Sequence, residues 1–139
     1  MRLIPAIAAC TALSLVQPAV AQDPGSDGIA IELNAARDAE AGCTLSFLVT
    51  NGRDSDVAAA VYETVLFDTE GQVERLTLFD FGALPAGRPR VRQFTLPETP
   101  CAEIGRILVN GASTCDAAVE GACMAGLSLS SRTGIEVIG

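Results

Sequence analysis

Four cysteines carry the clearest covalent chemistry in this sequence. Cys43, Cys101, Cys115 and Cys123 follow an apolar N-terminal segment that holds a fifth cysteine, Cys10. An even number of cysteines behind a removable leader is typical of a disulfide framework in an oxidising compartment. The sequence contains no Cys-x-x-Cys pair and no His, which disfavours a zinc site and a thioredoxin-like redox site. We therefore predict that these four cysteines are structural and that no metal is bound.

Three arginines at alternate positions form a second candidate site. Arg88, Arg90 and Arg92 would share one face of an extended strand, because side chains of a strand alternate between its two faces. Guanidinium groups bind carboxylates and phosphates through paired hydrogen bonds, so this stripe could hold an anion or an acidic partner. The alternative is weak cross-strand pairing with nearby acids such as Glu63, Asp68 and Glu74.

An apolar group follows the same region of the chain and suggests a contact surface. It consists of Leu76, Leu78, Phe79, Phe81 and Leu84. Some of the group must be core, but strict alternation cannot bury both Leu78 and Phe79 on one face, so another part could be an exposed patch or strand edge. We predict an interaction patch at Phe79 and Phe81, with core packing as the alternative.

Composition excludes several classes of function. The chain has 139 residues and a net charge of −8, which disfavours nucleic-acid binding. All nine cations are Arg, and without His or Lys there is no imidazole base, serine triad or Schiff-base amine. Carboxylates two apart at 54–56 and 68–70 do not match a calcium loop. We therefore expect neither an enzyme nor a cofactor.

The first residues are typical of a secretory signal peptide. Arg2 precedes an apolar stretch, and Ala19-Val20-Ala21 supplies a small-residue cleavage site. Too few residues precede Cys10 for a lipoprotein leader. We predict a cleaved signal peptide over 1–21, a flexible linker over 22–28 and a domain over 29–139. The protein is then periplasmic through Sec-type export, with no stable membrane insertion after cleavage.

Short alternating segments separated by turns predict an all-β fold. The expected strands cover 29–34, 44–50, 57–67, 73–79, 90–96, 106–110 and 127–138. About seven strands at this spacing indicate an immunoglobulin-like two-sheet antiparallel sandwich, with a small barrel as the alternative. An Ala-rich stretch over 116–124 predicts a short helical segment. No buried Trp is available, so the likeness to immunoglobulins concerns architecture only.

Strand direction predicts how the cysteines pair. If successive strands alternate in direction, Cys43 and Cys101 lie at one end of the sandwich. Cys115 and Cys123 then lie at the opposite end, between the last two expected strands. Of the three possible pairings, Cys43–Cys101 with Cys115–Cys123 is therefore the easiest to form.

The stretch over 66–94, the spacing of the last three cysteines and the closing SSRTGIEVIG resemble a group of small exported bacterial proteins. The resemblance spans nearly the whole chain after the leader and implies no activity, cofactor or catalytic residue. We expect a periplasmic interaction or envelope-accessory module whose partner is another envelope protein. A small-ligand or metal-ion carrier is the alternative, and a hydrolase is a weaker one.

Overall fold

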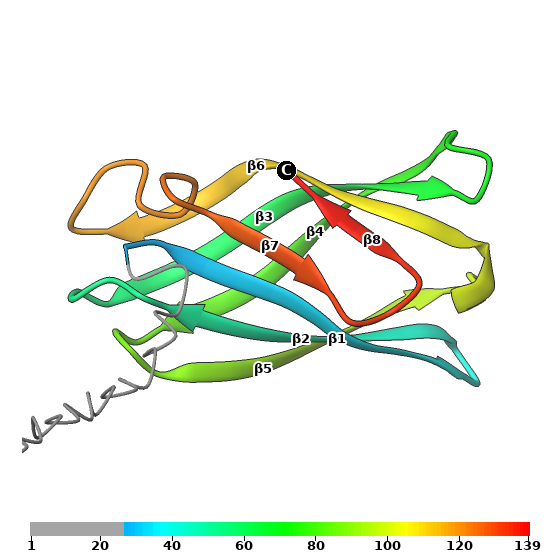
Figure 1. The fold of residues 1–139 in the computed structure, drawn as a ribbon, viewed down its shortest axis with the longest axis horizontal. Helices are drawn as coiled ribbons and strands as arrows, with labels where there is room; N and C mark the ends of the chain where they lie inside the picture. The colour runs from blue at the N-terminus through cyan, green and yellow to red at the C-terminus, as the bar shows by residue number, and fades with distance from the viewer. Residues whose placement is uncertain (1–26) are drawn as a thin grey trace, which may run out of the picture.

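Two four-stranded sheets pack face to face in the computed structural model, which describes residues 27–139 (Figure 1). The expected signal peptide and most of the expected linker lie outside the described residues. The first sheet has the order β5 (Pro89–Pro97), β2 (Gly42–Asn51), β1 (Ile29–Ala39), β7 (Ser128–Ser131). The second sheet has the order β4 (Val73–Leu84), β3 (Val57–Asp68), β6 (Ile104–Ala117), β8 (Glu136–Ile138).

Alternating burial explains why these segments form strands. In β2, Cys43, Leu45, Phe47 and Val49 are buried, and the residues between them are half-buried. The same alternation in the other long strands directs one row of apolar side chains into the space between the sheets. Removing those side chains from water is the main favourable term in folding. The two-sheet sandwich predicted from the sequence is therefore confirmed.

The last expected strand is two strands, and the sheets are not purely antiparallel. β7 pairs in parallel with β1, and β8 pairs in parallel with β6. Between them, the hydroxyls of Ser131 and Thr133 accept hydrogen bonds from the backbone N–H groups of Thr133 and Ile135. Such local bonds stabilise a turn, which carries the chain from the first sheet to the second. The structure thus has eight strands in two mixed sheets, whereas the sequence predicted about seven antiparallel strands.

The prediction of a helical segment near 116–124 is wrong. β6 continues to Ala117 because it stays paired with β3, and turns follow it. Gly121 and Gly126 adopt positive φ angles of 72° and 70°, which favour glycine and end any helical course. The described residues hold one short 3-10 turn, η1 (Cys101–Glu103), before β6.

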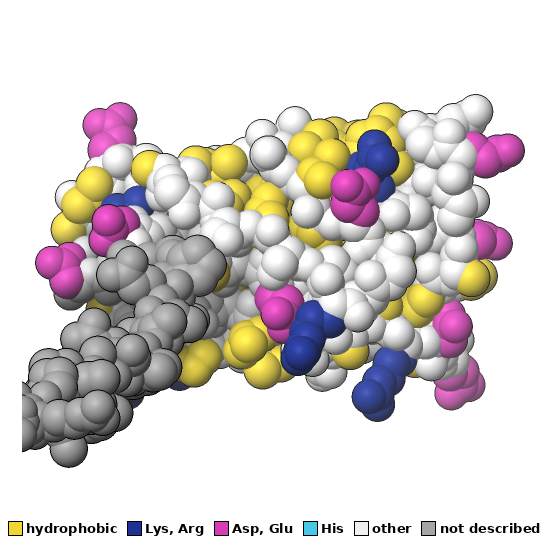
Figure 2. All heavy atoms as spheres, in the orientation of Figure 1, with side chains coloured by type: hydrophobic (Ala, Val, Ile, Leu, Met, Phe, Trp, Pro, Cys, Tyr) yellow, Lys and Arg dark blue, Asp and Glu magenta, His cyan; other side chains and the backbone are white. Residues whose placement is uncertain are grey.

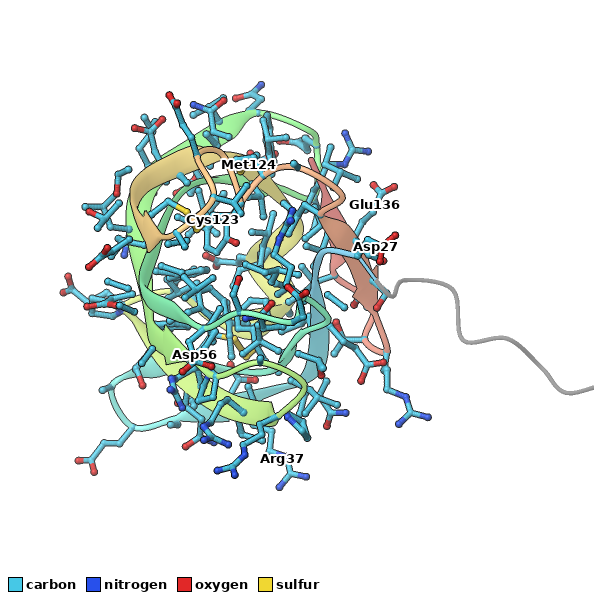
Figure 3. The ribbon with its side chains drawn as sticks, turned by 90° about the vertical axis from the view of Figure 1, so that its left-hand side faces the viewer. Asp27, Arg37, Asp56, Cys123, Met124 and Glu136 are labelled. Atoms are coloured by element: carbon cyan, nitrogen blue, oxygen red, sulfur yellow. A yellow bond between two sulfur atoms is a disulfide. The ribbon has the colours of Figure 1, made fainter. Side chains whose placement is uncertain are left out.

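Both predicted disulfides form, one at each end of the sandwich. Cys43 on β2 pairs with Cys101 at the start of η1, and their Cα atoms lie 4.8 Å apart. This bond joins the first sheet to the segment that enters β6 of the second. Cys115 on β6 pairs with Cys123 in the following loop. The end-on view of Figure 3 shows the filled interior, with Arg37 directed outward.

We predict that the two disulfides contribute unequally to stability. Closing a loop of 58 residues restricts the unfolded chain by about 4 kcal/mol, and closing a loop of 8 residues by about 2.5 kcal/mol. The double variant Cys43→Ala/Cys101→Ala should therefore lose more unfolding free energy than Cys115→Ala/Cys123→Ala. Urea denaturation monitored by circular dichroism measures both losses. An equal loss in the two variants would contradict the loop-length argument.

Candidate functional site

Phe79 and Phe81 belong to the core and do not form an exposed patch. Their side chains are 3% and 2% exposed. Both point from β4 toward the first sheet, where the Phe79 ring stacks on Phe94 with centroids 4.4 Å apart. Phe81 meets Phe47 and Tyr62 edge to face. The predicted interaction patch at these two residues is therefore corrected: the aromatic side chains hold the sheets together near their β4–β5 side.

The arginine stripe lies at the open side of the sandwich between the edge strands β4 and β5, which we call the seam. Arg92 reaches from β5 across the seam to β4. Its Nε donates to the carbonyl of Phe81 at 2.7 Å, and a terminal nitrogen donates to the carbonyl of Ala83 at 3.2 Å. These carbonyls lie on an edge strand, so the guanidinium supplies partners that no neighbouring strand provides.

Arg75 bridges the seam in the opposite direction. From β4 it donates to the carbonyl of Pro97 at 3.4 Å and to Oγ1 of Thr99 at 3.1 Å. Arg90 donates to the carbonyl of its neighbour Pro89, and Arg88 is exposed ahead of β5. The structure thus separates the three arginines of the stripe. Arg92 bonds backbone carbonyls of the second sheet, and none of the expected acids forms an ion pair with the stripe.

The acidic loops use their carboxylates to close turns. Oδ1 of Asp68 accepts hydrogen bonds from the N–H groups of Glu70 and Gln72, both at 2.9 Å. Oδ1 of Asp56 accepts from the N–H of Ala86 at 2.8 Å. Among residues 27–139, no group of three or more His, Cys, Asp or Glu side chains is placed to hold a metal ion. These carboxylates therefore have a structural role in the turns.

A pocket of about 260 Å³ opens at the Arg75 end of the seam. Its wall is partly apolar and partly charged, with Leu66, Arg75, Thr99 and Glu103 among its lining residues. Typical ligand pockets are larger, on the order of 300–1,000 Å³, and mostly apolar. Arg75 already donates to Pro97 and Thr99, so its guanidinium is partly engaged within the protein.

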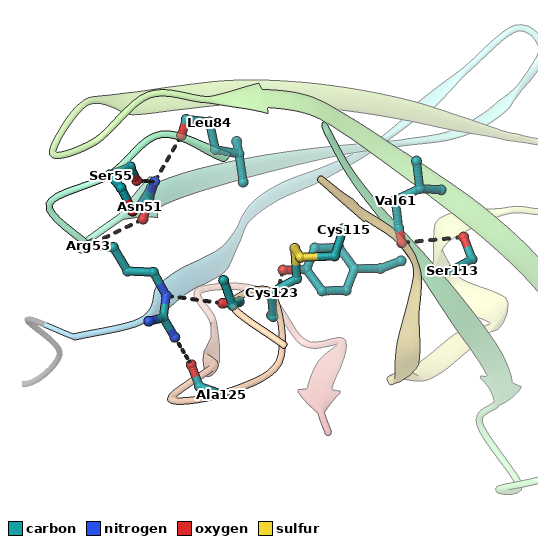
Figure 4. Close-up of a disulfide and its surroundings, with 11 residues drawn as sticks. Asn51, Arg53, Ser55, Val61, Leu84, Ser113, Cys115, Cys123 and Ala125 are labelled. Carbon is teal, nitrogen blue, oxygen red and sulfur yellow. Dashed lines mark hydrogen bonds between the residues drawn. A yellow bond between two sulfur atoms is a disulfide. The ribbon is translucent and has the colours of Figure 1, made fainter. Parts of the chain in front are cut away.

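A hydrogen-bond network fixes the loop closed by the Cys115–Cys123 disulfide (Figure 4). Arg53 donates to the carbonyls of Ala122 and Ala125 at 3.2 and 2.7 Å. The buried hydroxyl of Tyr62 donates to the carbonyl of Cys123 at 2.8 Å. Burial of this phenol raises the pKa of Tyr62 far above its ordinary value, because the charged form would be desolvated. These hydrogen bonds and the disulfide hold the loop over one end of the core.

The outer face of the second sheet carries a continuous apolar surface. One cross-strand row joins Leu76 of β4, Val65 of β3, Leu108 of β6 and Ile138 of β8. Val73 is 59% exposed, Leu76 62% and Leu78 57%. Phe67, Leu108 and Ile138 are half-buried, and Val65 between them is only 8% exposed. We call this surface the apolar face and define it as Val65, Phe67, Val73, Leu76, Leu78, Leu108 and Ile138.

The outer face of the first sheet is mainly polar. Thr44 and Thr95 are joined across β2 and β5 by a hydrogen bond between their hydroxyls, and Gln93 donates to Ser46. Leu48 and Val91 form an apolar pair in this face, and Glu32 of β1 follows them in the same cross-strand row. One sheet thus shows the polar outer face expected of a solvated sheet, and the other does not.

Sequence reasoning identified the apolar group on β4 but assigned the wrong members to the surface. Alternation separates Leu76 and Leu78 from Phe79 and Phe81 without indicating which set points inward. What decides this is contact with the first sheet, because Phe79 stacks on Phe94 and Phe81 meets Phe47 edge to face.

We predict that Arg92→Ala destabilises the fold by about 1–3 kcal/mol, because the carbonyls of Phe81 and Ala83 lose a charged donor. The exposed Arg88 provides a matched control, and Arg88→Ala should change the free energy of unfolding by less than about 0.5 kcal/mol. Urea denaturation of both variants tests the difference. Equal losses would show that Arg92 does not stabilise the seam.

We predict a pH dependence that originates at Tyr62. In the unfolded chain this phenol loses its proton near its ordinary pKa of 10.0, whereas burial keeps it protonated in the folded state. The free energy of unfolding therefore falls as pH rises above about 10, by up to about 1.4 kcal/mol per pH unit. The chain has one Tyr and no Lys, so Tyr62→Phe should remove this slope.

Urea denaturation of both proteins at several pH values between neutral and strongly alkaline measures the slope. The Phe variant is also expected to be less stable at neutral pH by about 0.5–1.5 kcal/mol, because the carbonyl of Cys123 loses its donor. If the two proteins lost stability in parallel above pH of about 10, the phenol would not be the source.

Comparisons with known proteins do not place this chain in a family. No protein-family model, curated protein or solved structure matches it. Within residues 27–139, no helix is long and apolar enough to span a membrane. The resemblance to small exported bacterial proteins stays a prediction from the sequence, and arguments about function depend on the surfaces described above.

Proposed function

We propose that the protein is a non-catalytic binding module of the cell envelope that docks another protein on its apolar face. The observation that carries this proposal is the difference between the two outer faces. Leu76 and Leu78 are more than half exposed on the second sheet; Leu76 lies in the aliphatic row with Val65, and Leu78 pairs with Glu63. Contiguous exposed apolar surface of this kind is typical of protein interaction sites.

Charge around the apolar face indicates the chemistry of the partner. Glu63, Glu74, Asp80 and Glu136 lie on or beside the face, and Arg106 is paired with Glu136 at 2.7 Å. Acidic side chains also stand at both ends of the molecule in Figure 2. A partner with an apolar centre and basic residues around it would complement this surface and associate faster at low salt. A second copy would bring the same acidic rim, so it fits less well.

The cellular location in this proposal is the periplasm. Two disulfides join the described part of the chain, and such bonds are typical of an oxidising, extracytoplasmic compartment. The sequence of residues 1–21 favours export by the Sec route. The absence of His and Lys from the whole sequence supports a binding role over a catalytic one.

Site-specific photo-crosslinking in intact cells tests this docking surface. A photo-crosslinking amino acid replaces either Leu78 on the apolar face or Val91 on the opposite sheet. Their exposures of 57% and 61% make them matched positions. We expect a discrete adduct from position 78 and none from position 91. Co-expressed protein without the crosslinking residue should compete for the adduct, whereas co-expressed Leu76→Ser/Leu78→Ser protein should compete at least about tenfold less well.

Mass spectrometry of the adduct then identifies the attached segment, which we expect to contain basic residues beside apolar ones. Adducts of equal yield from both positions, or competition that the double variant leaves unchanged, would contradict docking on the apolar face. The melting temperature of the double variant serves as the folding control, because both leucines are exposed and their replacement should leave the core intact.

A further inference from the structure

The edges of the two sheets differ in how well they are protected against a further strand. β5 has Pro at both ends, and Arg90 and Arg92 on its inner side. β7 and β8 are only 4 and 3 residues long. Beyond Leu108, β6 has register shifts against β3 at three places. Prolines, inward charges, short strands and bulges are the features that prevent edge-to-edge pairing.

β4 has one inward charge, Arg75, and is otherwise unprotected over its central part. From Arg75 to Asp80 it pairs with β3 residue by residue, without a register shift. The shifts lie outside this stretch, near Val73 and Gly82. Arg92 covers β4 only at the carbonyls of Phe81 and Ala83. Among the described residues no strand pairs with β4 on its outer side, so a regular edge with exposed Leu76 and Leu78 remains open.

We propose that the partner docks by adding an extended segment to β4 as a further strand of the second sheet. This inference rests on the proposed function and specifies how the apolar face is used. Along the edge, the outward side chains are, in order, Glu74, Leu76, Leu78 and Asp80. Glu74 lies beside the register shift at the start of this stretch. The matching segment carries two apolar residues at alternate positions on one face, with a basic residue beyond each of them.

A second copy of this chain is a poor occupant of the same edge. An antiparallel pair of β4 strands centred on Thr77 would place Leu76 opposite Leu78 of the other copy. The same register would place Glu74 opposite Asp80 twice, and like charges directly opposite are destabilising. A shift by two residues would place either Glu74 opposite Leu78 or Asp80 opposite Leu76. The edge therefore selects a segment with basic ends from a different protein.

Synthetic peptides test the added strand directly. In the probe peptide, Thr residues alternate with Arg, Val, Val and Arg, in that order. One face of the extended peptide therefore carries side chains that complement the two acids and two leucines of β4. Nuclear magnetic resonance of the labelled protein should show shifted backbone amides in β4 and slower hydrogen exchange there. A peptide with Glu in place of both Arg should bind about tenfold more weakly at low salt, because two attractive pairs become repulsive.

Methylation of the peptide backbone separates strand addition from side-chain contact alone. Only every second amide of an added strand faces β4, so N-methylation of one alternate set should abolish binding and methylation of the other set should preserve it. Binding that is insensitive to both sets, or no binding of the unmethylated probe, would overturn the added strand. Dimerisation of the protein that Leu78→Ser abolishes would overturn the choice of a different protein as occupant.

The two proposals can fail separately. If the crosslink at position 78 remains specific while N-methylation has no effect, the apolar face docks a partner by side chains alone. If the crosslink is absent, the proposed function fails whatever the peptides do. Val91→Ser protein is the control for the peptide titration, because it removes an equally exposed residue from the opposite sheet and should bind the probe unchanged.

Discussion

The two sheets share no backbone ladder, so the structure depends on what crosses the space between them. Near the seam this is an aromatic cluster in which Phe79 stacks on Phe94 and Phe47 contacts Phe81. Arg75 and Arg92 cross the seam in opposite directions and donate to backbone carbonyls. At the two ends, disulfides replace packing that a small core could not supply alone. The aromatic and arginine contacts fix the position of β4 relative to the first sheet, whereas the Cys43–Cys101 disulfide joins β2 to the segment that enters β6.

Strand positions and disulfide pairing followed from local rules, whereas the role of individual side chains did not. Alternation along β2 specifies a strand wherever it is placed, and strand direction then limits which cysteines can meet. The inward set on β4 depends on contact with the first sheet, which no local pattern specifies. The guanidinium of Arg92 binds carbonyls whose positions depend on the bulge near Gly82, so searching for acidic neighbours could not find its partners.

The errors at the C-terminal part of the chain have a related cause. The Ala-rich stretch after Cys115 has good local helix propensity, but pairing of β6 with β3 and the disulfide to Cys123 override it. The residues over 127–138 alternate as one strand would. Hydroxyl groups of Ser131 and Thr133 close a turn within that stretch, and the two halves pair with different sheets. Tertiary contacts decided both outcomes.

The same strand holds the sheets together on one face and leaves apolar side chains exposed on the other. Arg75 and Arg92 bond β4 to the first sheet on either side of Leu76 and Leu78, so these leucines stand on a strand anchored at both ends. Rigid surfaces lose less conformational entropy on binding, which favours association even when the contact area is modest. Because its arginines are largely engaged with carbonyls or near neighbours, the chain presents mainly carboxylates around that edge. Arginines that bond carbonyls stabilise the seam and do not offset the carboxylates, so the acidic rim of the apolar face has the same origin.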